Sequence, residues 1–293
     1  VVLGMGAAVG AYFMLSLMVA FAKILSDTHS VIEIAFYRNV IGCLPFLFIV
    51  FALGRREILI LRTRPAWVAF RAVLGTVSLV VTFWAYSLMP LADTAALLFT
   101  ASLFIPVLGV IFLKESVGPW RWSAVAIGFV GVMIMTRPSG DVFILGVSVA
   151  LFAAFLHATL QIILRYLGRY ESPATISFYF FAIGSVLTTA AMPFVAVMPT
   201  LDEFPYLLGV GLSGAAAQWL LSVAYRNAPA AIVTVFNYTS IVWAMLFGWM
   251  IWNDWPATAV LIGAVIVIAS NVLIAWRESR RRSPALPTQP VPD

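Results

Sequence analysis

The chain has 293 residues, of which 63% are hydrophobic and only 10% are charged, and its net charge is +5. Water-soluble domains carry about 25% charged residues, so this composition excludes a soluble globular protein, which would lack polar side chains to cover its surface. The basic excess does not indicate nucleic-acid binding, because the positive charges gather at the ends of apolar runs, a pattern typical of membrane topology. The composition therefore predicts a multi-span membrane protein.

Ten apolar runs follow one another along the chain, each close to the roughly 20 residues that a helix needs to cross the hydrocarbon of a bilayer. Short polar segments, many with proline or glycine, separate them. Helices are expected rather than strands, because lipid offers no partner to an unpaired backbone group. The expected spans are 3–25, 32–53, 66–88, 94–113, 120–136, 142–165, 174–198, 205–225, 232–252 and 257–276.

The positions of lysine and arginine predict the orientation of these spans. If the N-terminus is cytoplasmic, the connections on that side hold most of the basic residues, including the arginines of "GRREILILRTRP" and of the C-terminal tail. The connections on the opposite side then hold only Arg137. Basic residues concentrate in cytoplasmic loops, so we expect both termini in the cytoplasm of a bacterial cell and the spans in its inner membrane.

The second half of the chain resembles the first. "IAFYRNVIG" at 34–42 recurs as "ISFYFFAIG" at 176–184, and further matches follow in the same order. Five spans are an odd number, so the second copy should enter the membrane upside down, and basic loops do swap sides: "GRREILILRTRP" corresponds to the acidic "TLDEFP". The sequence predicts an all-α integral membrane fold of ten transmembrane helices in an inverted five-plus-five repeat. Its expected parts are residues 1–138, residues 139–277 and a disordered, basic and proline-rich cytoplasmic tail at 278–293.

Two segments carry a family resemblance. "AYSLMPLADTAALLFTASLFIPVLGVIFLKE" looks like the fourth-span signature of the drug/metabolite transporter superfamily, with Pro106 and Glu115 in fitting places. "YRNAPAAIVTVFNYTSIVWAMLFGWMIWND" looks like its second copy, with Met245 where a proline is common and Asp254 for the glutamate. The chain resembles the EamA-type ten-helix transporters of that superfamily and is similar to their aromatic amino acid exporters. The resemblance implies a carrier of small metabolites that works by alternating access.

Several cargoes remain open at this point. Export of amino acids, with aromatic ones as the first candidate, is the leading interpretation. A carrier or exchanger of a vitamin or a nucleotide-like metabolite is the alternative within the class, and an integral-membrane enzyme is the alternative from another class. The sequence has no GxSxG, Walker or HExxH motif and no Cys/His cluster, so we expect no catalytic residues, no metal and no cofactor. The expected partners are a small-molecule substrate and the bilayer, without nucleic acid, and the protein is expected to be a monomer.

Arg38 is the first candidate for substrate binding. It lies about 9 Å into the second span at 1.5 Å per residue, where an arginine facing lipid is costly, so it should face the bundle interior. It could anchor a substrate carboxylate, or it could bond backbone carbonyls as a structural residue. Its counterpart in the second half is Phe180, so the charge is not repeated. Arg71, nearer the cytoplasmic end of its span, is interpreted as an arginine that snorkels to the interface.

The other candidates are aromatic or polar residues inside spans, which would suit a flat, amphipathic solute. Ordinary helix packing is the competing interpretation for each of them. His157 could bind substrate, carry a proton or form an interhelical hydrogen bond. All twelve acids lie in or next to loops, which favours facilitated diffusion or exchange over ion coupling. The predicted substrate-binding residues are Arg38, Tyr37, Phe99, Thr100, His157, Tyr179, Gln218, Asn237, Tyr238 and Trp84.

Overall fold

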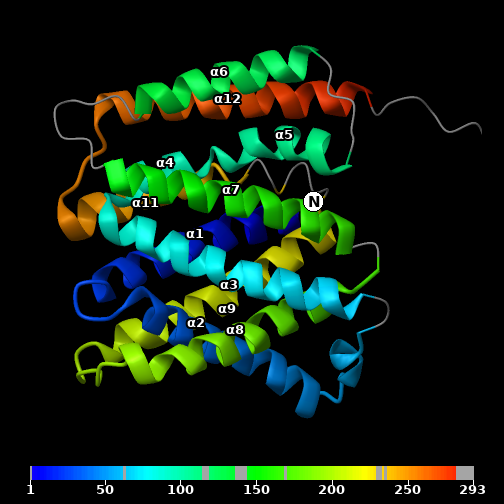
Figure 1. The fold of residues 1–293 in the computed structure, drawn as a ribbon, viewed down its shortest axis with the longest axis vertical. Helices are drawn as coiled ribbons and strands as arrows, with labels where there is room; N and C mark the ends of the chain where they lie inside the picture. Colours follow the sequence, from blue (N-terminus) through cyan, green and yellow to red (C-terminus); the bar gives the residue numbers. More distant parts are fainter. Residues whose placement is uncertain are drawn as a thin grey trace, which may run out of the picture.

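A computed structural model gives the structure of the chain and describes residues 2–61, 64–113, 119–135, 144–167, 170–228, 233 and 236–281. These residues form helices joined by short connections, and none of them lies in a β-strand (Figure 1). The helices are α1 (Val2–Leu25), α2 (Val31–Phe51), the short 3₁₀ helix η1 (Arg56–Leu59), α3 (Pro65–Leu88), α4 (Leu91–Leu98), α5 (Ala101–Leu113), α6 (Pro119–Met135), α7 (Ile144–Leu167), α8 (Pro173–Val195), α9 (Phe204–Asn227), α11 (Thr239–Trp252) and α12 (Thr258–Arg281).

Six of these helices, namely α1, α2, α3, α7, α8 and α9, are long and apolar enough to cross a bilayer. The remaining apolar segments, in α4–α5, α6, α11 and α12, are shorter. The outward faces carry large apolar side chains, such as Phe48, Val186 and Val265, which are 63%, 69% and 65% exposed. Extensive apolar surface of this kind would be unfavourable in water but suits contact with lipid. The chain is therefore a multi-pass membrane protein.

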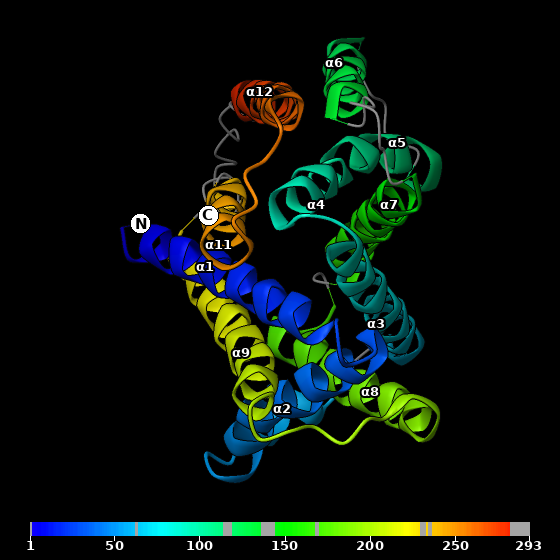
Figure 2. The same cartoon turned by 90° about the vertical axis from the view of Figure 1, so that its left-hand side faces the viewer.

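The main packing partners come from opposite halves of the chain. Helix α1 packs against α9, α3 against α7 and α8, and α2 against α8 and α9. Helix α6 pairs with α12 at one end of the molecule, and α2 and α8 lie at the opposite end (Figures 1 and 2). Between these ends, α11 contacts α1 and α4, while α5 contacts α7. The two halves thus interlock and do not form separate bundles.

Helices α2 and α8 begin in the same way. The Ser30 side chain accepts a hydrogen bond from the backbone N–H of Glu33 at 3.2 Å, and the Ser172 side chain accepts one from Thr175 at 3.1 Å. Serine is a favoured N-cap residue because its oxygen satisfies a free N–H group of the first turn. The two caps precede the two copies of the repeated segment by the same number of residues.

The fourth span is not the continuous helix over 94–113 that its hydropathy predicts. Helix α4 ends at Leu98 and α5 begins at Ala101, with Phe99 and Thr100 between them. The backbone N–H and the hydroxyl of Thr100 both donate to the carbonyl of Leu97, at 3.0 and 2.8 Å. A hydroxyl that bonds the preceding turn competes with the regular helical ladder, and hydropathy does not detect this interruption.

The ninth span and the C-terminal tail also differ from expectation. Within the expected span 232–252, α11 begins only at Thr239, and Asn237 and Tyr238 form a turn before it. The Thr239 hydroxyl donates to the carbonyl of Phe236 at 2.7 Å, just as the Thr100 hydroxyl donates to the carbonyl of Leu97 in the first half. Helix α12 continues to Arg281, so residues 278–281 of the expected disordered tail are helical. The rest of the tail lies outside the described residues.

Candidate functional site

Arg38 lies in the protein interior and not at a lipid or water interface. Its side chain projects from α2 and is 6% exposed. The guanidinium carbon is 4.9 Å from the ring centroid of Phe180 and 4.5 Å from that of Phe181, both on α8. Nη1 donates to Oδ1 of Asn39 at 2.9 Å, whereas Nε has no hydrogen-bond partner among the described residues. The two rings stabilise the cation by their π faces but do not satisfy its N–H groups.

Arg71 differs from the sequence interpretation, because it does not snorkel to the interface. Its guanidinium carbon lies 4.5 Å from the ring centroid of Phe180, the same ring that Arg38 contacts. Nε and Nη1 are buried without a hydrogen-bond partner in the described part of the chain. The cation–π contact with Phe180 on α8 stabilises the inward orientation of the side chain. The position of Arg71 along α3 does not by itself predict this contact. The two guanidinium groups are therefore less than about 10 Å apart, within the range at which like charges repel in a poorly solvated interior.

Two glycines allow α2, α3 and α8 to approach each other around these arginines. A Cβ atom on Gly75 of α3 would lie 2.8 Å from a ring carbon of Phe180. A Cβ atom on Gly184 of α8 would lie 2.8 Å from Nδ2 of Asn39 and 2.9 Å from Oγ1 of Thr76. All three distances are too short for a real Cβ contact, so only glycine fits at these two positions without a shift of the neighbouring side chains.

Gln218 lies about one helical turn from the arginine cluster. Its Nε2 donates to the hydroxyl of Ser177 at 2.8 Å, which links α9 to α8. Gly214 precedes Gln218 by four residues, which is about one turn, and a Cβ atom on Gly214 would lie 3.4 Å from Nε of Arg38. The structure thus places two predicted site residues, Arg38 and Gln218, in the same interhelical region.

A second group of predicted residues meets where α4, α5 and α11 approach each other. The rings of Phe99 and Tyr238 have centroids 5.2 Å apart and planes inclined by 33°. Thr100 is fully buried beside Phe99, and Asn237 is half-buried beside Tyr238. All four residues lie at the two helix interruptions described above, so the fold brings together predicted residues that are far apart in the chain.

His157 and Tyr179 make contacts that join helices or connections. Nε2 of His157 on α7 lies 3.2 Å from Oγ1 of Thr82 on α3, which matches the packing interpretation of this histidine. The hydroxyl of Tyr179 donates to the carbonyl of Leu59 at 2.9 Å and ties α8 to η1. Neither of these two hydrogen bonds involves the arginines or the Phe99–Tyr238 pair.

Tyr37 and Trp84 are the two remaining predicted residues. The ring of Tyr37 is half-buried and packs edge-on against Phe36, with centroids 5.2 Å apart. Trp84 is 42% exposed on α3. An aromatic residue inside a span can face either lipid or protein, and its sequence position does not decide between the two.

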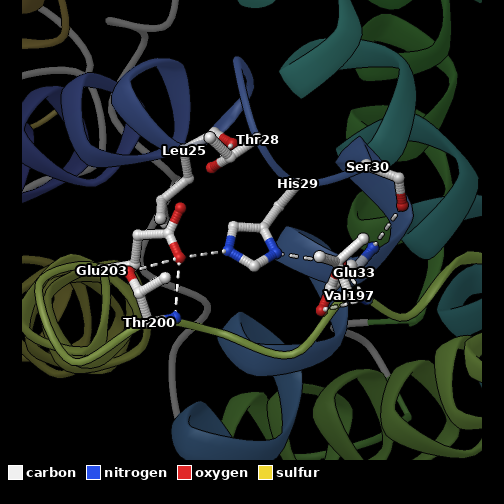
Figure 3. A network of polar contacts seen from close by, with 8 residues as sticks. All are labelled: Leu25, Thr28, His29, Ser30, Glu33, Val197, Thr200 and Glu203. Atoms are coloured by element: carbon white, nitrogen blue, oxygen red, sulfur yellow. Dashed lines mark hydrogen bonds and ion pairs between the residues drawn. The ribbon is translucent and has the colours of Figure 1, made fainter.

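A polar network that the sequence analysis did not identify joins the α1–α2 connection to the α8–α9 connection. Figure 3 shows the imidazole of His29 between two carboxylates, with Nδ1 3.1 Å from Glu33 and Nε2 3.3 Å from Glu203. The buried carboxylate of Glu33 also accepts hydrogen bonds from the backbone N–H of Val197 at 3.3 Å. A protonated imidazole would form ion pairs with both carboxylates and hold the two connections together.

The environment of Glu203 favours its charged form. A hydrogen bond from the Thr28 side chain and two from Thr200 lower the pKa of Glu203 from 4.5 to about 2. The backbone N–H and the hydroxyl of Thr200 both donate to Oε2 at 2.8 Å. The carboxylate is therefore ionised throughout the physiological pH range. Among the described residues, no group of three or more His, Cys, Asp or Glu could hold a metal ion.

Comparisons with known proteins agree with this architecture. The sequence pattern of the EamA-like transporter family matches residues 2–137 and again residues 144–276. A riboflavin transporter of Vibrio cholerae serotype O1 is 29% identical, with 75% of each chain covered. A pseudopaline exporter of Pseudomonas aeruginosa is 28% identical, with 92% of this chain and 94% of the exporter covered. A protein of known crystal structure has the same fold, with a TM-score of 0.64 and 16% identity over 95% of this chain and 99% of that one.

Proposed function

Because the chain belongs to the EamA-like transporter family, we propose that it moves a small metabolite across the bacterial inner membrane by alternating access, with both termini in the cytoplasm. The chain is a small-molecule transporter and not an enzyme, as the family and its named members are transporters. The identity of its cargo, the direction of transport and the alternating-access mechanism are proposals.

The proposed architecture is ten spans in an inverted repeat, with units at 1–138 and 139–277. Support comes from the two successive matches of the family pattern, which leave little of the chain between them. The helix contacts give further support, since exchanging the halves turns the α1–α9 pair into α7–α3 and the α2–α9 pair into α8–α3. The same exchange leaves the α2–α8 and α6–α12 pairs unchanged, as a two-fold relation between the halves requires.

The observation that carries the proposed mechanism is the meeting of two interrupted helices. Phe99 and Tyr238 stack at the interruptions before α5 and α11, one from each half. Irregular backbone at membrane depth is tolerated only where protein buries it or where it lines a cavity, and transporters place substrate sites near such discontinuous helices. We therefore locate the substrate path between this pair and the Arg38 cluster.

The proposed cargo is an amino acid, with aromatic ones as the first candidates, exported from the cytoplasm. Rings such as Phe99 and Tyr238 could stack on a flat solute, and the guanidinium of Arg38 could bind its carboxylate. A vitamin is the second candidate, and the similarity to a riboflavin transporter favours it. Both candidates present a planar ring on which Phe99 and Tyr238 could stack, but only the amino acid carries a carboxylate for Arg38.

The test is transport by the purified full-length protein in liposomes. Labelled phenylalanine, tryptophan, riboflavin and a non-aromatic amino acid such as alanine are supplied with and without an imposed proton or sodium gradient. We expect saturable flux of one of the aromatic solutes that does not depend on either gradient. Flux of alanine alone would contradict the cargo proposal, and accumulation driven by a gradient would contradict uncoupled transport.

A further inference from the structure

We infer that Arg38 and Arg71 together form a binding site for an oxyanion, either a carboxylate or a phosphate group, carried by the transported solute. This inference rests on the proposed function, because the anion is taken to belong to the cargo. It assigns a role to Arg71, which the sequence interpretation placed at the membrane interface.

Both arginines lack a counter-charge in the part of the chain that the structure describes. Among the described residues, no carboxylate lies within ion-pair distance of either arginine, and the recorded ion pairs are those of His29. A buried charge without a partner is costly, and in a membrane segment such a charge usually serves a substrate or ion path. Two uncompensated cations that share Phe180 would be stabilised by a bound anion, since it lowers their mutual repulsion.

The two guanidinium groups have a large capacity for hydrogen bonding. Arginine carries five N–H donors in a planar fork that matches carboxylate and phosphate oxygens. Arg38 uses one donor nitrogen on Asn39, and Arg71 donates to no described residue. Contacts with the faces of Phe180 and Phe181 fix the positions of the groups without using their N–H donors. The aromatic contacts thus fix the two guanidinium groups, while Nε of Arg38 and Nε and Nη1 of Arg71 have no hydrogen-bond acceptor among the described residues.

The two halves of the chain differ at the positions of these arginines. The residue that corresponds to Arg38 in the second half is Phe180, and the one that corresponds to Arg71 is Val210. The scaffold therefore forms with apolar residues at the equivalent positions, and Val210 is fully buried there. Charges that packing alone does not require are best explained by the ligand.

The test measures binding with solute pairs that differ in the anionic group. The pairs are phenylalanine with phenylalaninamide and flavin mononucleotide with riboflavin, and free inorganic phosphate is a separate probe. Binding to the purified full-length protein is followed as the ligand-dependent rise in unfolding temperature. We expect wild-type protein to bind the anionic member of one pair at least about 10-fold more tightly, because a charge-assisted hydrogen bond contributes this much or more.

Substitution of each arginine tests whether its guanidinium group causes this preference for the anionic solute. Arg38→Gln and Arg71→Gln should each reduce the ratio of affinities to near one. The matched control is Arg64→Gln, since Arg64 also stacks on an aromatic ring, that of Tyr170 at 5.5 Å, but is exposed. The control should keep the wild-type ratio. If one of the two arginine variants does not fold, the other still tests the prediction.

Three results would overturn the inference. These are equal affinities for both members of both pairs, a wild-type ratio that persists in both arginine variants, or stabilisation by phosphate alone, which would make the cluster a counter-ion site. Counterflow in liposomes separates this inference from the proposed function. A solute that binds with the expected ratio but is not transported would leave the oxyanion site standing and contradict the transport mechanism.

Discussion

Phe99 and Tyr238 hold the same position in the two halves of the chain, and their rings face each other with centroids 5.2 Å apart. Each residue lies at an interruption of its helix, directly before α5 or α11. An aromatic pair is worth about 0.5–1.5 kcal/mol beyond its buried area. In the proposed alternating-access mechanism the two halves move relative to each other, and such a movement would change the distance between these two rings.

Removing one ring of this pair should impair transport. We expect Phe99→Ala to lower the initial flux of an aromatic cargo by roughly 10-fold, because it removes about 1 kcal/mol of ring contact and part of the binding surface. The measurement is initial flux per amount of reconstituted protein. The control is Trp249→Ala on α11, where the side chain is 52% exposed. Equal losses in the two variants would argue against a specific role for the pair.

The inverted arrangement can be tested with a membrane-impermeant thiol reagent. Cys43 is buried and is the only cysteine, so Cys43→Ala gives a background without thiols. In this background we expect Asp202→Cys to be labelled from outside intact cells. Arg56→Cys should be labelled only after the membrane is permeabilised, because the two connections correspond in an inverted repeat. Labelling of both positions from the same side would contradict the repeat.

Gly184 should tolerate substitution poorly. A Cβ atom there would lie 2.8 Å from Nδ2 of Asn39 and 2.9 Å from Oγ1 of Thr76, so we expect Gly184→Ala to destabilise the protein by about 1–3 kcal/mol, as overpacking does. Gly6 on α1 has no atom within 4 Å of its Cβ position, and Gly6→Ala should be neutral or slightly stabilising. Thermal unfolding in detergent measures both, and similar unfolding temperatures for the two variants would argue against the close approach of α2, α3 and α8.

The network around Glu203 predicts a defined pH dependence. Its pKa is lowered from 4.5 to about 2, so its ionised form stabilises the folded state fully above the ordinary value, and this contribution is lost as the pH falls from 4.5 towards 2. The difference in unfolding temperature between wild type and Glu203→Gln should therefore persist from pH 8 down to about pH 5.5 and shrink as the pH falls below 4.5. A difference that already disappears between pH 7 and pH 6 would contradict this assignment.

The repeat was the most informative pattern in the sequence for the candidate site. Matching "IAFYRNVIG" with "ISFYFFAIG" pairs Arg38 with Phe180, and in the structure these two side chains contact each other. In the proposed inverted repeat a residue near the two-fold axis would meet its own counterpart, and the contact between Arg38 and Phe180 fits that arrangement. The same logic pairs Phe99 with Tyr238.

The inward position of Arg71 and the role of His29 could not be predicted in this way. Arg71 is close enough to its helix end to snorkel, and only the location of Phe180 on a neighbouring helix explains its direction. His29 contacts Glu203, which lies far along the chain on another connection. Hydropathy and spacing carry no information on such pairings.

By itself the sequence determined that this protein lies in a membrane and roughly where its apolar segments run, and it contained the similarity between the halves, because apolar run length and internal similarity are properties of the chain alone. The tertiary structure decided where the fourth helix is interrupted and which buried cations share a ring. Those features depend on how each helix is rotated and which helix packs against it. The physical reason is that side chains from segments more than a hundred residues apart compete for the same interior space.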